Sequence, residues 1–548
     1  MLHTYVESHL QRALASINAP SDTNVVFEIP RQQGQGHLST TVAMALAKSM
    51  RGNPRAIAQS IVDALGNDVP FVQSIEIAGP GFINITFDAA AFHDMLRTMI
   101  EQGADVGRSD IGGGRTVNVE YVSANPTGPL HAGHGRNCAV GDTIANLLAW
   151  CGFAVTREYY FNNAGNQMNK LGESIDARVR HRLGDPEFPF PEDGYHGEYI
   201  HAIADDIVAT RQDAYEACSD DERRAFCRRA GEQWCFDLIK KTLDSLNIHH
   251  DVFFNEDSLY TEGKITATIE ALRQRGLVYE KDGATWLALT ELGQQQDKVI
   301  VKSSGEPTYR LPDIAYHAGK LAQGYDMLVD IFGADHIATI PDVLAGVTAL
   351  GQDASKVRVV IHQMVTFVEN GEVVKFSKRS GKSFTLDELI DEVGADVVRF
   401  FFVMRAAGTH LEFDLGLAKE EGDKNPVFYL QYAHARIASI LRKAAEQGIA
   451  VDESADLHVL AHERELELIT LLSRFRQVVE RAADQLEPHT VAEYLRDLAA
   501  AYHNFYHDCR ILGSEPAVQG ARLLLAEVTR RAMRNGLAVL GVGAPEVM

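Results

Sequence analysis

The chain has 548 residues, 45% of them hydrophobic, and 52 lysines and arginines against 75 aspartates and glutamates give a formal net charge of −23. A single hydrophobic core rarely grows beyond about 250–300 residues, so we expect several domains. The acidic balance argues against a nonspecific nucleic-acid-binding protein, whose domains are usually basic, although it leaves room for a local basic surface.

The apolar residues and the cysteines argue against two further classes. No apolar run approaches the roughly 18–20 residues of a membrane span. The N-terminal stretch MLHTYVESHLQRAL is an amphipathic pattern without the basic and apolar regions of a signal peptide. The six cysteines are scattered without C-x-x-C spacing, so neither a zinc site nor a disulfide framework is expected. We therefore expect a cytoplasmic protein with no membrane partner and no metal site of its own.

Residues 1–112 are predicted to form an α+β domain. In NPRAIAQSIVDAL, Asn53 is placed to cap a helix and Pro54 to occupy its first position. The stretch SIEIAGPGFINITF alternates on both sides of Gly79-Pro80-Gly81, which predicts two strands joined by a turn. The glycine-rich segment 103–115 then predicts a domain boundary.

Residues 113–384 are predicted to form a Rossmann-type domain. TVNVEYV (116–122) predicts a strand, NCAVGDTIANLLAWCG a helix that ends near Gly152, and FAVTREYYF the next strand. A strand, a glycine-bearing loop, a helix and a second strand form a β-α-β unit, which is typical of a parallel sheet that binds nucleotides.

This sheet is predicted to be interrupted by a helical insertion at about 170–248. Ser219 and Glu222 form a capping box inside that polar segment. Strand-like runs resume at 326–336 and 357–367, which places the second half of the sheet after the insertion.

Everything from about residue 385 is predicted to be helical. Thr385 and Glu388 form another capping box. The segment 385–424 is expected to be a helical linker, and 425–548 a helical bundle whose last long helix ends at Gly536. The predicted fold class is α/β, with a Rossmann-type parallel sheet and insertion between an N-terminal α+β domain and a C-terminal all-α bundle.

The stretch HAGHGR (131–136) lies where the first strand of the sheet gives way to its helix. Such a loop directs backbone N–H groups and the positive end of the helix dipole at a phosphate. Histidine side chains add donors, and Gly133 leaves room for a base or ribose. Taken alone, the pattern is as compatible with His131 and His134 as helix caps or solvated side chains.

A second polar loop, VVKFSKRSGKSF (373–384), carries Lys375, Ser377 and Lys378 just before a helix. Lysines in such a loop suit the neutralisation of a triphosphate, because phosphoryl chemistry depends on positioning and electrostatics. If it stood alone, an ordinary solvated turn would be the more common explanation.

Together and in this order, the two motifs resemble the HIGH and KMSKS signatures of class I aminoacyl-tRNA synthetases. The wider sequence resembles the arginyl-tRNA synthetase family over essentially the whole chain. The stretches that carry this resemblance are IAGPGFINITF, VEYVSANPTGPLHAGHGR, YYFNNAGNQ, DVFFNEDSLY, TYRLPDIAYH, GADH, KFSKRSGKSFTLDELIDEVGADVVRFFF, NPVFYLQYAHARI and NGLAVLGVGAPEVM.

The resemblance implies an arginine–tRNA ligase. Arginine would react with ATP, accompanied by Mg²⁺, to give arginyl-adenylate and pyrophosphate, and would then pass to the 2′-hydroxyl of the terminal adenosine of tRNA(Arg). The implied catalytic residues are His131, His134, Lys375 and Lys378. The implied ATP-binding residues are His131, Gly133, His134, Ser377, Lys378, Asp335 and His336.

The same resemblance implies an arginine site. Glu120 and Asn125 would hold the α-amino and carboxylate groups and the side chain, while Tyr309 and Asp313 would bind the guanidinium. A guanidinium has five donors in a fixed fork, which calls for carboxylate partners. Without the family, a surface salt bridge would be the better explanation for Asp313.

Aromatic and basic residues alternate in the C-terminal bundle, in QYAHARI (431–437), AYHNFYHDCR (501–510) and the basic stretch TRRAMRN (529–535). Aromatic faces interleaved with cations suit unstacked bases of RNA, although helical aromatics more often belong to a core. The bundle resembles an anticodon-binding domain, and the residues implied to bind tRNA are Tyr432, His434, Arg436, Tyr502 and Arg510, with Phe505 and Tyr506 beside them.

Three positions depart from the family pattern: Asn163 where an aspartate is usual, the LPD before the acid at 313, and GQGH at 34–37. Two other functions remain open on the residues. A nucleotidylyltransferase also uses an HxGH loop, but it would be small and would not need the part after 425. A non-catalytic tRNA-binding paralogue would have lost one of the two motifs. We expect a monomer.

Overall fold

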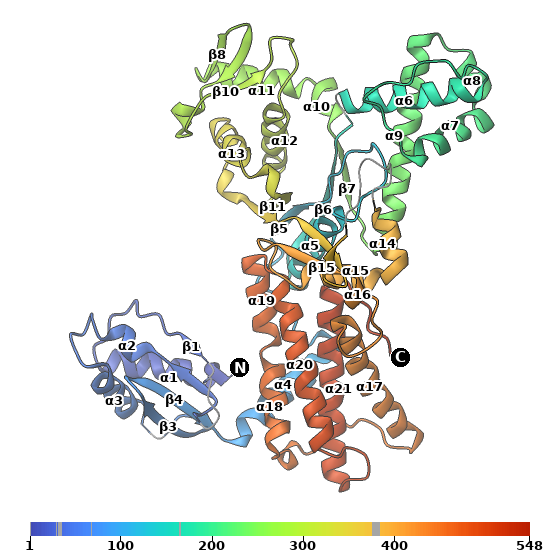
Figure 1. The fold of residues 1–548 in the computed structure, drawn as a ribbon. Helices are drawn as coiled ribbons and strands as arrows, with labels where there is room; N and C mark the ends of the chain where they lie inside the picture. The colour runs from blue at the N-terminus through green and yellow to red at the C-terminus, as the bar shows by residue number, and fades with distance from the viewer. Residues whose placement is uncertain (1, 29, 31–34, 67, 164–165, 375–383) are drawn as a thin grey trace.

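The structure is a computed structural model that describes residues 2–28, 30, 35–66, 68–163, 166–374 and 384–548. Figure 1 shows an N-terminal domain beside a long helical bundle, with a central sheet above the bundle and two separate insertions above the sheet. In the described part of the chain, no helix is both long and apolar enough to cross a membrane.

The N-terminal domain is a four-stranded antiparallel sheet in the order β1-β2-β4-β3, with three helices. Its elements are α1 (Leu2–Ser16), β1 (Phe27–Glu28), β2 (Leu38–Thr40), α2 (Val42–Leu46), α3 (Pro54–Leu65), β3 (Val72–Ala78) and β4 (Phe82–Phe87). The side chain of Asn53 caps α3 by accepting a hydrogen bond from the backbone N–H of Arg55 at 2.9 Å. The predicted helix start is confirmed.

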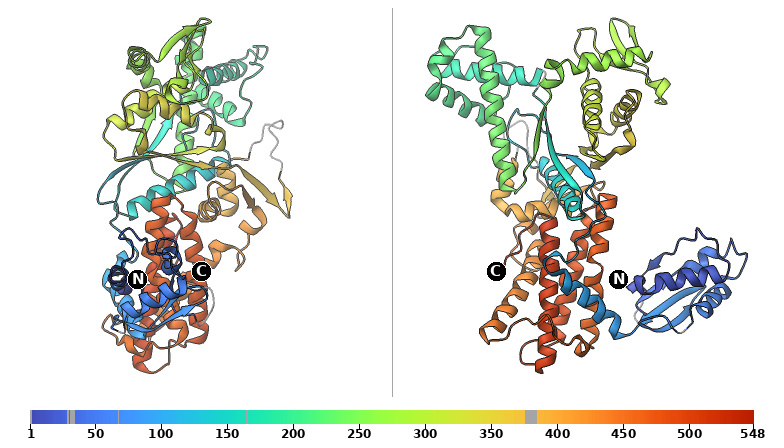
Figure 2. Two further views of the ribbon diagram at one scale, coloured as in Figure 1. Left: turned by 90° about the vertical axis from the view of Figure 1, so that its left-hand side faces the viewer. Right: turned by 180° about the vertical axis from the view of Figure 1, so that it is seen from behind.

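Helix α4 (Ala89–Gln102) leaves this domain and packs on the C-terminal bundle, as both views in Figure 2 show. His93 is buried and its Nε2 lies 2.9 Å from the carbonyl oxygen of Leu460. Arg97 donates to the carbonyl oxygen of Glu453 at 2.6 Å. Helix α4 thus attaches the N-terminal domain to the bundle near the end of the chain.

The central sheet has five parallel strands in the order β12-β11-β5-β6-β7. Its elements are β5 (Thr116–Glu120), α5 (His134–Trp150), β6 (Ala154–Phe161), β7 (Val252–Asn255), β11 (Met327–Gly333), α13 (Ile340–Ala349) and β12 (Val357–His362). The order reverses between β5 and β11, as in the doubly wound Rossmann arrangement, where ligands bind beyond the carboxyl ends of the strands at this reversal. The predicted α/β fold class is confirmed.

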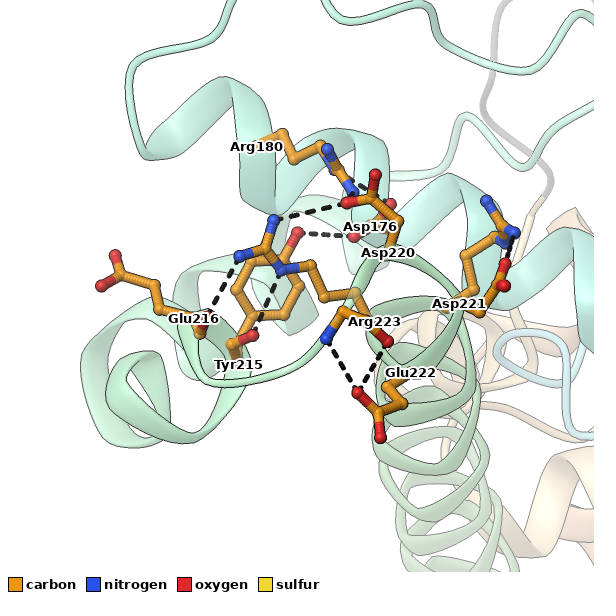
Figure 3. A network of polar contacts seen from close by, with 10 residues as sticks. Asp176, Arg180, Tyr215, Glu216, Asp220, Asp221, Glu222 and Arg223 are labelled. Carbon is orange, nitrogen blue, oxygen red and sulfur yellow. Dashed lines mark hydrogen bonds and ion pairs between the residues drawn. The ribbon is translucent and has the colours of Figure 1, made fainter.

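The first insertion lies between β6 and β7, and its described residues form helices and connecting loops. It contains α6 (Asn166–Arg182), α7 (Glu198–Thr210), α8 (Gln212–Glu216) and α9 (Asp220–Ser245). Figure 3 shows the polar contacts that join these helices: Arg180 bridges Asp176 at 3.1 Å and Asp220 at 2.7 Å. Ser219 and Glu222 form the capping box of α9 that the sequence predicts.

The second insertion lies between β7 and β11 and was not predicted. It contains α10 (Asp257–Thr261), α11 (Lys264–Gln274), β8 (Val278–Lys281), β9 (Ala284–Leu287), β10 (Lys298–Val301) and α12 (Arg310–Ala322). Its three strands form an antiparallel sheet in the order β10-β9-β8. Helix α12 returns the chain to the central sheet, so residues near its start can face the carboxyl end of β5.

The segment that follows β12 contains a strand, at 411–414, that corrects the expectation of a wholly helical linker over 385–424. It contains β13 (Val365–Glu369), β14 (Glu372–Val373), α14 (Leu386–Val393), α15 (Ala395–Val403), β15 (Leu411–Asp414) and α16 (Leu415–Ala418). Strand β15 pairs in parallel with β13. Leu411 and Phe413 are buried while Glu412 between them is exposed, an alternation with the period of a strand.

The C-terminal bundle consists of α17 (Pro426–Glu446), α18 (Glu463–Ser473), α19 (Phe475–Gln485), α20 (His489–Asp508) and α21 (Pro516–Val539). The prediction that the last helix ends at Gly536 is wrong, because α21 continues through that residue. A Cβ at Gly536 would come within 2.6 Å of the Leu495 side chain. The glycine therefore permits close packing of α21 on α20 and is not a cap.

Arg399 of α15 connects the bundle, the first insertion and the central sheet. Its side chain is buried and its guanidinium pairs with Asp142 of α5. The same guanidinium donates to the carbonyl oxygens of Leu246, just beyond α9, at 2.7 Å and of Leu540, just beyond α21, at 3.3 Å. The helix that begins with HAGH is therefore fixed from the side of the bundle.

Candidate active site

A cavity of about 510 Å³ opens at the carboxyl ends of β5 and β11, where the strand order reverses. This is the position at which open α/β sheets bind ligands. Six residues that the sequence analysis singled out line it: Glu120, Asn125, Tyr309, Asp313, Asp335 and His336. They come from three separate stretches of the chain, which only the fold brings together.

The backbone beyond β5 turns sharply into this cavity. Val122 and Ser123 have positive φ angles of 69° and 44°. Such angles are uncommon outside glycine and are strained for a β-branched valine, a feature that gathers at functional sites. Asn137 holds the turn by accepting from the Val122 N–H at 2.6 Å and donating to the carbonyl oxygen of Ile331 at 2.9 Å. One amide thus joins the ends of β5 and β11.

The two histidines of HAGH lie at the N-terminus of α5, and their rings stack with centroids 3.6 Å apart. The Nδ1 of His134 accepts a hydrogen bond from the backbone N–H of His131 at 3.2 Å. Burial, together with the smaller effects of His131 and His362, lowers the pKa of His134 to about 3. The ring is therefore neutral with its proton on Nε2, which makes that nitrogen a donor at a helix N-terminus.

The lysine loop expected to work with HAGH cannot be placed, since Lys375, Ser377 and Lys378 lie outside the described residues. The residues that follow it are described. The carbonyl oxygen of Phe384 accepts from the N–H of Ala132 at 3.0 Å, and the N–H of Leu386 donates to the carbonyl oxygen of Leu130 at 2.8 Å. The chain after residue 383 therefore runs directly beside HAGH.

Acidic side chains converge at the other part of the cavity. Burial raises the pKa of Asp313 to about 7. His317 opposes this rise, whereas the neighbouring carboxylates of Glu120 and Glu256 reinforce it. Burial also raises the pKa of Glu256, which follows β7 and which the sequence analysis did not single out. This part of the cavity has carboxyl groups that a cation would stabilise in their charged form.

Glu120 is less available than the resemblance implied. It is 4% exposed, and its carboxylate accepts from the Tyr316 hydroxyl at 2.7 Å and the Lys320 ammonium at 3.0 Å. Glu120, His317 and Asp330 are close enough to hold a metal ion. The Lys320 ammonium already lies 3.0 Å from Glu120 and 3.4 Å from Asp330, so a cation of the protein occupies this cluster.

The residues expected to bind tRNA divide into two sets. The guanidinium of Arg436 lies over the rings of Tyr432 and Tyr506, at 4.8 and 5.0 Å from their centroids. In contrast, His434 and Tyr502 are 1% and 0% exposed. The expectation that their side chains meet tRNA is corrected, because both point into the bundle from the inner faces of α17 and α20.

The remaining residues of the bundle that were expected near tRNA also differ in exposure. Arg510 is exposed and lies beyond the end of α20, whereas Phe505 is buried and cannot meet tRNA. The basic stretch at 529–535 is not a free cationic surface, because Arg530 and Arg531 both pair with Glu527 at 2.8 Å. Arg530 also pairs with Glu546 and Arg531 with Glu453, both at 3.2 Å, so acidic side chains offset the two charges that would attract a phosphate.

Asn163, one of the departures from the family pattern, has a local explanation. Its side-chain amide donates to Glu232 of α9 at 2.7 Å, and Asn163 is buried. An aspartate here would place two carboxylates together, which is costly in a buried position. The amide therefore suits the glutamate that faces it.

A Rossmann-type sheet with histidines at its first helix, interrupted by insertions and followed by a helical bundle, defines a class I aminoacyl-tRNA synthetase. Residues 97–399 match the family model "tRNA synthetases class I (R), catalytic domain". Residues 4–87 match "Arginyl tRNA synthetase N terminal domain" and residues 430–548 match "DALR anticodon binding domain". The chain belongs to the arginyl-tRNA synthetase family.

Relatives agree over nearly the full length. An arginine–tRNA ligase of Salinibacter ruber is 47% identical, over 99% of this chain and 100% of the relative. One of Desulfotalea psychrophila is also 47% identical, over 95% of this chain and 94% of the relative. The arginyl-tRNA synthetase structure of Thermus thermophilus has the same fold, with a TM-score of 0.78 at 24% identity and full coverage of both chains.

Proposed function

We propose that this arginine–tRNA ligase activates arginine in the cavity between β5 and β11 and transfers it to tRNA(Arg). The observation that carries the assignment is that one cavity is lined both by the carboxyl group of Asp313 and by Asn137, one turn into the helix that begins with HAGH. The acids suit the guanidinium, and the helix N-terminus suits phosphate. The matched relatives set aside the nucleotidylyltransferase and the non-catalytic paralogue.

In the first step the carboxylate of arginine attacks the α-phosphorus of ATP in line, and pyrophosphate leaves. The Nε2–H of His134 and the N-terminus of α5 donate to phosphate oxygens as negative charge moves onto the leaving group. His131, Gly133, Asp335 and His336 complete the proposed ATP site, together with Ser377 and the lysines at 375 and 378. Mg²⁺ enters with ATP as part of the substrate. The protein contributes position and charge and forms no covalent bond.

In the proposed arginine site, Asp313 and Tyr309 bind the guanidinium. They lie four residues apart at the start of α12, so they share one face of the helix. Asn125 and Glu120 lie nearer β5 and hold the α-amino end. In the second step the 2′-hydroxyl of the terminal adenosine attacks the acyl carbon of arginyl-adenylate, and AMP leaves.

The tRNA surface that we propose comprises Tyr432, Arg436 and Arg510, with Tyr506 in place of the buried Tyr502. Residues 1–112 are assigned to tRNA contact, 113–384 to catalysis, 385–424 to the stem of the tRNA and 425–548 to the anticodon. We further propose that the enzyme is a monomer and acts in the cytoplasm, where tRNA is charged.

Pyrophosphate exchange with each amino acid, measured with and without tRNA(Arg), tests the proposal. We expect exchange with arginine alone and, as in the family it resembles, only when tRNA is present. Exchange with another amino acid, or no exchange with arginine and tRNA together, would contradict the assignment.

The guanidinium site has its own test in Asp313→Asn, assayed by aminoacylation with arginine and citrulline. Loss of a charge-assisted pair should raise the arginine KM about 10²-fold and reduce the preference for arginine over citrulline. The ATP KM should stay near normal, because HAGH is unchanged. An unchanged ratio of arginine to citrulline would transfer the role to another acid near Asp313, with Glu120, which lines the cavity, and Glu256 as the candidates.

A further inference from the structure

Lys320 lies beneath the cavity without lining it. Its side chain is 2% exposed, and its ammonium contacts Glu120 of β5 and Asp330 of β11. The ammonium also lies 4.7 Å from the centre of the Tyr316 ring. A buried lysine of this kind needs full compensation of its charge, and the structure provides it from two neighbouring strands.

One face of α12 supplies most of the cluster. Asp313, Tyr316, His317 and Lys320 follow the spacing i, i+3, i+4, i+7, which places them on the same side of a helix. The first faces the cavity as the proposed guanidinium partner, and the other three contact acids of the sheet. The helix thus carries the substrate contact and its supports as one unit.

The contacts fix the orientation of Glu120. Its Oε2 accepts from Lys320 and shares the Tyr316 hydroxyl with Glu158, each at 2.7 Å from that hydroxyl, while its Oε1 accepts from Ser123 at 3.3 Å. Rotation of the carboxylate would break the two shorter contacts. Glu120 is therefore held with one oxygen committed to the protein and the other near the strained turn that enters the cavity.

The charges of the cluster do not balance without a ligand. The carboxyl groups that face one another come from β5, β6, the residue after β7, β11 and α12, and they are Glu120, Glu158, Glu256, Asp330 and Asp313. The facing cations are Lys320 and His317, whose pKa Asp330 raises to about 9 against the opposing effect of burial. The remaining titratable groups are the hydroxyls of Tyr160, Tyr260 and Tyr316.

Stability alone does not account for such a group. A buried ion pair commonly adds little stability compared with apolar side chains of similar size, so its retention calls for another role. Lys320 and His317 together compensate Glu120 and Asp330, which leaves Asp313 as the acid on this face of α12 that a ligand can neutralise.

We propose that Lys320 is a positioning residue for arginine selection: it balances Asp330, orients Glu120, and so leaves Asp313 for the guanidinium of the substrate. This inference rests on the proposed function, because it deepens the assignment of the same cavity. Without Lys320, Glu120 is no longer held toward the sheet, and an additional uncompensated acid competes for the cation.

The test compares Lys320→Met, which keeps the length of the side chain and removes the charge, with the wild type. The assay is aminoacylation at several pH values, with the KM of arginine and of ATP measured separately. We expect an arginine KM at least tenfold higher, an unchanged ATP KM, and a bend in the pH profile of the arginine KM moved up by about one unit. The matched control is Lys264→Met, on the exposed side of α11, which should change none of these.

A second variant separates charge from packing. Lys320→Met/Asp330→Asn removes one charge of each sign, so it should return the pH bend to within half a unit of the wild type even where Lys320→Met is too unstable to assay. A bend that stays displaced, or a folded Lys320→Met with wild-type arginine KM, would overturn the inference. If the wild type itself shows no exchange with arginine, it is the proposed function that fails.

Discussion

At the residue scale, His134 is best understood as an uncharged donor. With a pKa near 3 it stays neutral at every pH at which the enzyme would be assayed. His134→Ala should lower pyrophosphate exchange by about 10²–10³-fold, the effect of removing one preorganised donor. His134→Gln, which keeps an N–H, should recover part of the loss, and the arginine KM should change little in both. Normal exchange by His134→Ala would remove the start of α5 from the mechanism.

Asp313 predicts a pH dependence whose sign follows from its raised pKa. Below about pH 7 the carboxyl group of the empty site is protonated, and above it the carboxylate is ready to pair with a guanidinium. The arginine KM should therefore fall as the pH rises from 6 to 8, by up to about tenfold per unit below the pKa. Asp313→Asn should flatten the profile in steady-state aminoacylation. A flat wild-type profile would contradict the prediction.

The sequence predicts the residues proposed to contact the substrates better than the residues that hold them in position. HAGH, Tyr309 and Asp313 can be identified from motifs and resemblance. Asn137 and Lys320 cannot, because their partners Ile331 and Asp330 belong to a strand that joins β5 only after two insertions. The spacing of acid, tyrosine, histidine and lysine along α12 is a helical pattern that could have shown one face, but not what that face meets.

At the element scale, α5 depends on two small residues to lie close to its neighbours. A Cβ at Gly141 would come within 2.2 Å of the Tyr121 side chain at the end of β5, and one at Gly135 within 2.4 Å of Phe402. This close approach sets the distance between the sheet and the end of α5 that carries HAGH. Glycine at such a helix–strand contact has the same role in other Rossmann folds.

Gly141→Ala should therefore destabilise the protein by about 1–3 kcal/mol through overpacking and reduce pyrophosphate exchange as α5 shifts. The matched control is Gly319→Ala on α12, where an added Cβ has no neighbour within 4 Å and the position is exposed. That change should be neutral or stabilise by up to about 1 kcal/mol. Denaturant unfolding of both variants makes the comparison, and equal midpoints would contradict it.

The sequence predicts elements that depend on local patterns better than it predicts which side of an element faces the core. The capping boxes at Ser219 and Thr385 are local patterns and occur as predicted. Strand β15 is only four residues long and follows a helix. Its alternation of apolar and polar residues is too short to distinguish a strand from a continuing helix. His434 and Tyr502 were misplaced because composition reports that aromatics are present, not which side of a helix is turned toward the core.

At the scale of the whole molecule, the tRNA surface that we propose lies on α17 and α20 of the bundle, which extends below the central sheet (Figure 1). Arg436→Ala should weaken tRNA binding and reduce the log–log slope of affinity against salt by about 0.7 if its guanidinium meets one phosphate of a single strand. Exchange at saturating tRNA should be unchanged. Filter binding at several salt concentrations measures the slope.

The control for this change is Arg530→Gln, because Arg530 already pairs with Glu527 and Glu546. We expect its tRNA affinity and salt slope to match the wild type. Equal effects of the two variants would show that general charge, not the aromatic and cationic surface around Tyr432, determines tRNA binding.

The contact of Arg399 with Leu540 joins the middle of the chain to a residue near its end, which bears on the order in which a newly made chain completes its fold. Many proteins fold on the ribosome one domain at a time, from the N-terminus. Here Asp142 of α5 pairs with Arg399, and Arg399 in turn donates to a carbonyl group that is synthesised near the end of the bundle. Asn535 likewise donates to Ala104 and Val106, between the N-terminal domain and the sheet. The contacts that surround α5 and the start of the sheet are therefore complete only after the end of the bundle has been synthesised.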